Sequence, residues 1–203
     1  MPAYRINNKN VLFIHVPKTG GTTVEIFLSS NSSTSLHNAG VKLLRPVASA
    51  RLTRSLPLQH FHAELLEGIF APDFFDYAFV IVRDPLERMK SEYRHSRELR
   101  RLDTWLPFDQ WLTLTLGLAT VAPNLRNNHY RPQVDFLCFK AEIFRFEDGM
   151  DNIVRRLAER LGLSQPDAIP HERRTEKIAM AVSAASRARV RKIYASDYET
   201  FGY

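Results

Sequence analysis

Residues 11–23, VLFIHVPKTGGTT, decide the fold of this chain. The apolar run from Val11 to Ile14 has the length of a buried strand, and the apolar residues that follow Thr22 and Thr23 begin a helix. Two adjacent glycines between them allow a tight turn and a close approach of the backbone to a ligand. A strand, a glycine turn and a helix N-terminus present backbone N–H groups and a positive dipole end to an anion. The stretch therefore predicts a phosphate-binding loop.

This loop also supplies a cation and hydroxyl groups. Lys18 provides a point charge for a phosphate, and the two threonine hydroxyls add hydrogen-bond donors. The lysine precedes the glycines, so the G-x-x-x-x-G-K-[ST] spacing of common ATP- and GTP-binding loops is absent. An ordinary glycine turn is the alternative interpretation, but the full string PKTGGTT favours a nucleotide loop. The residues predicted to bind the nucleotide here are Pro17, Lys18, Thr19, Gly20, Gly21, Thr22 and Thr23.

The string FIHVPKTGGTT resembles the 5′-phosphosulfate loop of sulfotransferases that use 3′-phosphoadenosine 5′-phosphosulfate (PAPS). The similarity is greatest to the carbohydrate branch of that family, the heparan and chondroitin type, and to its bacterial relatives. A second block, YAFVIVRDPLERMKSEYRH at residues 77–95, resembles the family's 3′-phosphate motif, in which a buried strand is followed by an arginine and by a helix that carries a serine. The resemblance assigns Arg83 and Ser91 to the 3′-phosphate. It is strong over residues 10–30 and 75–96 and weaker elsewhere.

Strand and helix patterns alternate along the 203 residues. Further strands are predicted at residues 77–82, 142–146 and, less regularly, 136–139, and helices from Pro85, over 150–161 before Gly162, and over 175–197. This alternation favours one α/β domain over residues 1–203, with a central parallel β-sheet flanked by helices. The resemblance implies the P-loop-like sulfotransferase fold, with the ligand at the carboxyl ends of the strands. The segment 29–57 has no clear period and is predicted to be a mobile insertion.

Composition narrows the possible partners and the location. The net charge of +6 suits an anionic ligand, but the basic residues are scattered and no stacking aromatic motif accompanies them, so no nucleic acid is expected. No run of eighteen apolar residues occurs and the first strand begins by residue 11, so we expect neither a membrane span nor a signal peptide, and a cytoplasmic protein. Golgi sulfotransferases normally carry a membrane anchor. Nothing in the sequence indicates an oligomeric state.

Neither a cysteine nucleophile nor a metal site finds support in the sequence. Cys138 is the only cysteine and has apolar neighbours, so it is expected to be a buried hydrophobic residue without a nucleophilic role. No paired Cys/His cluster and no carboxylate set has the spacing of metal ligands, so no metal is expected.

Sulfuryl transfer needs a held donor, a stabilised leaving phosphate and a base for the acceptor hydroxyl. Lys18 is predicted to neutralise charge on the leaving phosphate. His60 and His62, between the two phosphate motifs, are the predicted bases, because imidazole titrates near neutrality. In the carbohydrate branch a histidine at this point is the base, and uronyl 2-O-sulfotransferases carry a His-x-His pair there. The sequence favours His60 and leaves His62 open.

The polar cluster at residues 127–133 resembles the acceptor side of the family's site. Arg131 and Gln133 are predicted to bind a sugar carboxylate or hydroxyl, with a plain polar turn as the alternative. The leading hypothesis is therefore a sulfotransferase that acts on a hydroxyl-bearing acceptor, in particular a saccharide or glycoconjugate. The alternatives are a kinase-like phosphotransferase and a non-catalytic protein that binds 3′-phosphoadenosine nucleotides.

Overall fold

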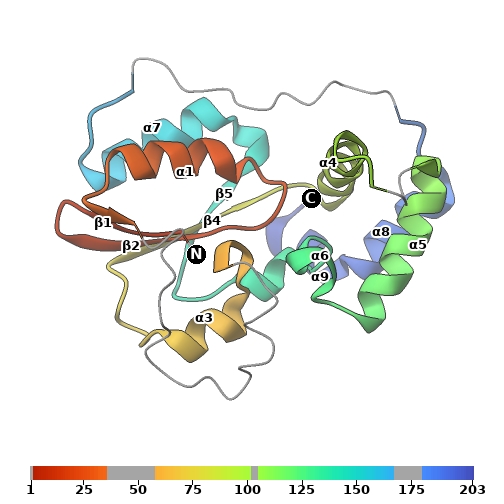
Figure 1. Ribbon diagram of the computed structural model, residues 1–203, viewed down its shortest axis with the longest axis horizontal. Coiled ribbons are helices and arrows are strands. Elements are labelled where there is room, and N and C mark those ends of the chain that lie inside the picture. The colour runs from red at the N-terminus through yellow and green to blue at the C-terminus, as the bar shows by residue number, and fades with distance from the viewer. Residues whose placement is uncertain (1, 36–57, 102–104, 167–179) are drawn as a thin grey trace. The chain divides into compact units, whose positions relative to one another are not determined.

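The computed structural model describes residues 2–35, 58–101, 105–166 and 180–203. The chain forms two compact units (Figure 1). The sheet unit comprises Met1–Val82 and Asp135–Glu172, and the helical unit comprises Arg83–Val134 and Arg173–Tyr203. That both belong to one domain stays a prediction. Most of the segment 29–57, which was predicted to be a mobile insertion, lies outside the described residues.

The described part of the sheet unit contains a five-stranded sheet in the order β3-β1-β2-β4-β5 (Figure 1). Strands β2, β4 and β5 are parallel neighbours, whereas β1 pairs antiparallel with β2 and with β3. The α/β class with a largely parallel sheet is thus confirmed, and so are the strands predicted at residues 11–14, 77–82 and 142–146. The strands are β1 (Ala3–Ile6), β2 (Lys9–Ile14), β3 (Thr34–Ser35), β4 (Tyr77–Val82) and β5 (Glu142–Arg145).

Strand β1 was not expected from the sequence, and its turn explains why it forms. Ile6 pairs with Lys9, so the hairpin between β1 and β2 has a two-residue loop made of Asn7 and Asn8. Both asparagines have positive φ, 46° and 63°, as a type I′ turn requires. Asparagine tolerates this left-handed backbone better than most residues do. The Asn-Asn pair was therefore the local signal for this hairpin.

The two faces of β2 are covered by different helices. Val11 and Phe13 belong to a core that includes residues of α1 (Gly21–Ser30) and α7 (Met150–Leu161), which lie on the same face of the sheet (Figure 1). Leu12 and Ile14 alternate with them, and on their side lie Phe61 and Leu66, the latter in α3 (Ala63–Ile69). This packing fixes the carboxyl end of β2, where the predicted phosphate loop begins.

The helical unit packs around Met89, Trp111 and Tyr194. Its first helix starts as predicted, because Asp84 accepts a hydrogen bond from the backbone N–H of Glu87 at 2.8 Å and Pro85 occupies the first turn. The second long helix of the unit was not predicted. The helices are α4 (Pro85–Glu98), α5 (Phe108–Val121), α6 (Leu125–Asn128), α8 (Ala184–Ile193) and α9 (Ala195–Phe201).

Two secondary-structure predictions were wrong. The expected helix over 175–197 is divided at Tyr194 into α8 and α9, and its described part begins only at Ala184, after Ser183 caps the Ser186 N–H. Residues 175–179 lie outside the described ranges. The expected strand at 136–139 is absent because Phe136 ends a 3₁₀ turn and Phe139 has φ of 52°, which a strand does not allow. Among the described residues, no helix is long and apolar enough to cross a membrane.

Candidate active site

The predicted phosphate loop connects β2 to α1, and its backbone is left-handed at two residues. Lys18 has φ of 70° and Gly20 has φ of 81°. A Cβ atom on Gly20 would also lie 2.9 Å from Met150 Sδ and 2.9 Å from Phe146 Cε2. Glycine is therefore required here by both conformation and space. The left-handed lysine costs about 1–2 kcal/mol, and strain of this kind is concentrated at functional sites.

The first turn of α1 is suited to an anion. In this helix, all of whose residues are described, the first turn contains no aspartate or glutamate, and the N-cap, Gly20, has no side chain to bond the N–H groups. The positive end of the helix dipole is thus not neutralised by the helix itself. Thr19 is fully buried and its hydroxyl donates to the Val16 carbonyl oxygen at 2.9 Å, so it stabilises the loop from within. Thr22, in the first turn of α1, is half-buried.

His15 joins this loop to a buried polar network. A Cβ atom on Gly21 would lie 2.1 Å from His15 Nε2, so the imidazole occupies the space beside the first residue of α1. His15 Nδ1 lies 2.7 Å from Glu25 Oε1, and both side chains are buried. Because a carboxylate only accepts, Nδ1 carries the proton of this hydrogen bond. Glu25 was not among the residues predicted for the site.

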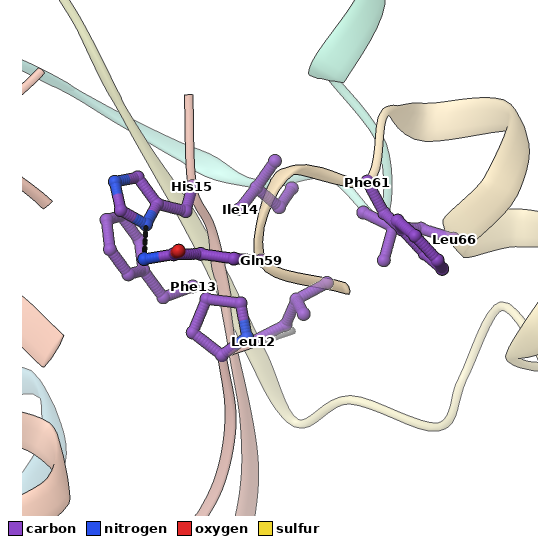
Figure 2. Close-up of a pocket in the computed structure, with 8 residues that line it drawn as sticks. Leu12, Phe13, Ile14, His15, Gln59, Phe61 and Leu66 are labelled. Carbon is purple, nitrogen blue, oxygen red and sulfur yellow. Dashed lines mark hydrogen bonds between the residues drawn. The ribbon is translucent and has the colours of Figure 1, made fainter. Parts of the chain in front are cut away.

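Gln59 completes the network from the other side. Its Nε2 donates to both Glu25 oxygens at 2.9 Å. Figure 2 shows the same amide nitrogen beside His15, whose Nδ1 lies 3.2 Å away. The amide and the imidazole thus turn their hydrogens to the same carboxylate. The pocket in Figure 2 has no room for a water molecule, so we interpret it as tight packing between β2 and residues 59–66. A carboxylate within the apolar run of α1 was the sequence signal for this network.

The two predicted bases have different surroundings. His60 Nδ1 lies 3.1 Å from the backbone oxygen of His15, and the two imidazole rings meet edge to face at 4.8 Å. A carbonyl oxygen only accepts, so the neutral His60 ring carries its proton on Nδ1 and its lone pair on Nε2. His62 is buried at the N-cap of α3, and its Nε2 lies 3.7 Å from Glu64 Oε2, beyond hydrogen-bond distance. His60 is thus hydrogen bonded to the segment in which the phosphate loop begins.

The residues assigned to the 3′-phosphate lie in the helical unit. Arg83 directly follows β4, and Ser91 lies in the second turn of α4; both are half-buried. Gln133 is fully buried, and its amide bonds the backbone of Arg83 and the carboxylate of Asp197. The partners of Gln133 are thus groups of the protein itself, rather than the sugar that the sequence hypothesis gave it.

Arg131 is held by a strained turn in the same unit. Arg126, Asn127 and Asn128 all have positive φ, between 50° and 65°. The Arg131 guanidinium donates to Asn128 Oδ1 at 3.1 Å and to Asn124 Oδ1 at 2.7 Å. These bonds orient its planar fork, which suits a carboxylate or a sugar hydroxyl.

Two buried charged residues of α4, Glu92 and Arg88, hold the residues that follow this turn. His129 Nδ1 lies 2.7 Å from Glu92 Oε2, and the buried Arg88 donates to the backbone oxygens of His129 and Arg131 at 3.1 and 2.8 Å. Glu92 and Arg88 were missed in the sequence because each lies beside the apolar residues of α4 and reads as part of a solvated face. Their hydrogen bonds hold the backbone of residues 129–131 in place.

A comparison with protein families decides the identity. The model of the sulfotransferase family matches residues 3–203, nearly the whole chain. The chain belongs to the sulfotransferase family. This sulfotransferase is therefore a PAPS-dependent transferase, which confirms the predicted class of enzyme and its donor. A search of curated proteins and a search of solved structures gave no match. Within the described residues of the sulfotransferase, no group of three or more His, Cys, Asp or Glu side chains is placed to hold a metal ion.

Proposed function

We propose that this sulfotransferase transfers the sulfuryl group of PAPS to a hydroxyl of a carbohydrate acceptor, with His60 as the general base. The observation that carries the proposal is the hydrogen bond from His60 Nδ1 to the His15 backbone oxygen, 3.1 Å. It assigns the ring's lone pair to Nε2, as a base requires. It also attaches the base to the residue that begins the phosphate loop.

The residues of the loop fit a phosphate group. Neither Gly20 nor Gly21 can carry a Cβ atom, so the backbone itself forms this part of the cradle. Residues 17–23 would hold the 5′ side of PAPS, and Arg83 and Ser91 would hold the 3′-phosphate. When bound, PAPS supplies the sulfuryl group. Lys18 places a positive charge at the loop, where it stabilises negative charge on a leaving phosphate.

The base and the acceptor residues then have separate tasks. His60 Nε2 accepts the proton of the acceptor hydroxyl, a task for which neither a lysine that is charged at neutral pH nor an arginine is suited. Arg131 would contact the acceptor, because a guanidinium oriented by two asparagines can bind a carboxylate or hydroxyl oxygen with two donors. Sugars, and uronic acids in particular, carry these groups, which supports a carbohydrate acceptor.

The test compares His60→Asn with His62→Ala in single-turnover assays with saturating PAPS and a panel of saccharide acceptors. The asparagine side chain of the first variant would retain a donor for the His15 oxygen but would have no base, so we expect a rate loss of about 10²–10⁴-fold. Binding of 3′-phosphoadenosine 5′-phosphate (PAP) in calorimetry should not change. His62→Ala should retain most of its rate per folded molecule.

The pH dependence gives a second reading of the same site. Imidazole accepts a proton only when neutral, so the wild-type rate should fall as the pH is lowered and the base becomes protonated. A His60→Asn enzyme should lose this dependence along with the rate. Near-full activity in His60→Asn would refute the assignment and would make a carboxylate such as Glu64 or Asp135 the next base to test.

A further inference from the structure

Gln133 makes an unusual pair of hydrogen bonds with the backbone of Arg83. Its Oε1 accepts from the Arg83 N–H at 2.9 Å, and its Nε2 donates to the Arg83 carbonyl oxygen at 2.8 Å. A single side chain thus satisfies both backbone groups of one residue, as a neighbouring strand would do. Arg83 needs such a partner because β4 ends at Val82 and α4 begins only at Pro85.

Asp197 fixes the orientation of this amide. The fully buried carboxylate of Asp197, in α9, accepts the backbone N–H groups of Gln133 and Val134, both at 3.0 Å, and Gln133 Nε2 at 3.3 Å. Because a carboxylate oxygen only accepts, the amide nitrogen of Gln133 must face Asp197, and the amide oxygen must face the Arg83 N–H. All four residues belong to the helical unit.

We infer that Gln133 and Asp197 are positioning residues for the 3′-phosphate of the nucleotide, acting through Arg83. This inference rests on the proposed assignment of Arg83 to the 3′-phosphate. An arginine side chain has four rotatable torsions, so its guanidinium is placed well only when its backbone is held. Two hydrogen bonds to the N–H and carbonyl groups of Arg83 restrict its backbone, and the Asp197 carboxylate in α9 prevents the Gln133 amide from exchanging its oxygen and nitrogen. The buried pair therefore aligns the arginine before the nucleotide binds.

A purely structural role for Gln133 gives a different result from a positioning role. A structural residue changes stability, and with it the binding of every nucleotide alike. A positioning residue changes only the binding energy that depends on the 3′-phosphate. The discriminating quantity is the ratio of two dissociation constants, one for PAP and one for adenosine 5′-phosphate, which lacks the 3′-phosphate.

The experiment measures this ratio by calorimetry for wild type, Arg83→Ala, Gln133→Met and the double variant. Gln133→Met removes both hydrogen bonds at similar volume. We expect it to weaken PAP binding by about tenfold, the order of one or two lost hydrogen bonds, and to leave adenosine 5′-phosphate binding unchanged. In the Arg83→Ala background the same substitution should have no further effect on PAP, because the group that it positions is already gone.

Two further variants keep the test decisive. Ser96→Ala removes a buried hydroxyl that bonds Glu92 and Arg101 in the same unit without touching Arg83, and should leave the ratio unchanged. Asp197→Asn keeps one acceptor oxygen and should shift the ratio in the same direction as Gln133→Met. If Gln133→Met does not fold, Asp197→Asn takes its place in the test. An equal loss for both nucleotides, or no loss, overturns the positioning role alone. An unchanged ratio in Arg83→Ala overturns the assignment of Arg83 and the inference with it.

Discussion

The substitution Gly21→Ala tests how closely the phosphate loop is packed against His15. The added Cβ would lie 2.1 Å from His15 Nε2 and 2.5 Å from the two neighbouring ring carbons. Ordinary contact is about 3.5 Å, so the ring must move by roughly 1.4 Å. The ring cannot do so freely, because it is hydrogen bonded to the buried Glu25 at 2.7 Å and stacked on Phe13 with centroids 5.1 Å apart.

The expected cost follows from these contacts. Overpacking costs about 1–3 kcal/mol, a hydrogen bond to a charged group contributes about 1.5–3 kcal/mol, and the alanine returns about 0.5–1 kcal/mol of helix propensity. The net loss in the free energy of unfolding should be roughly 2–5 kcal/mol, measured by urea denaturation followed by circular dichroism. Affinity for PAP should fall as well, because the first residue of α1 would be displaced from the loop.

A matched glycine provides the control. Gly68 lies in α3 of the same unit, and a Cβ atom there would meet nothing within 4 Å. Gly68→Ala should therefore stabilise the protein by about 0.4–1 kcal/mol. If Gly21→Ala unfolds at the same urea concentration as the wild type or a higher one, the described packing of His15 against the loop is incorrect.

Two further predictions concern Lys18 and Cys138. Lys18→Met keeps most of the length of the side chain without its charge. It should lower the single-turnover transfer rate by about 10²-fold and weaken PAP binding by less than tenfold, because the negative charge on the leaving phosphate grows toward the transition state. Equal losses in rate and binding would reduce Lys18 to a binding residue. Burial, with a smaller contribution from the Glu67 charge, raises the pKa of the Cys138 thiol to about 12. At pH 8 the thiolate fraction should be about 10⁻⁴. A disulfide reagent should therefore label the folded protein far more slowly than the protein in urea. Rapid stoichiometric labelling of the folded enzyme would contradict the buried environment of Cys138.

Local sequence was enough to predict the strand, glycine turn and helix around Gly20 and the start of α4. A strand that runs into two glycines and a helix is a short-range pattern, and the cap at Asp84 and the proline at the next position act on the same turn. The same holds for the end of α7, where Gly162 takes the left-handed conformation with φ of 65°. In each case the residues that determine the conformation lie within a few positions of one another.

The terminal helix shows where such local reasoning failed. Helical spacing continues across Tyr194, so the sequence predicted one helix where the structure has two. Tyr194 is fully buried, and its hydroxyl donates to the backbone oxygen of Tyr130, 64 positions earlier in the chain, at 2.8 Å. The break coincides with this tertiary contact, which helical periodicity cannot register.

The sequence alone determined the chemical types of the proposed site residues, which are a lysine, two glycines and a histidine pair. Only the tertiary structure decided what the polar side chains face. Glu25 meets Gln59 from 34 positions away, and Gln133 meets Arg83 from 50 positions away. An amide offers the same donors and acceptor to a sugar as to a peptide group, so its type does not reveal its partner. The fold settles that choice by burying the amide, because a buried polar group must find its hydrogen bonds within the protein.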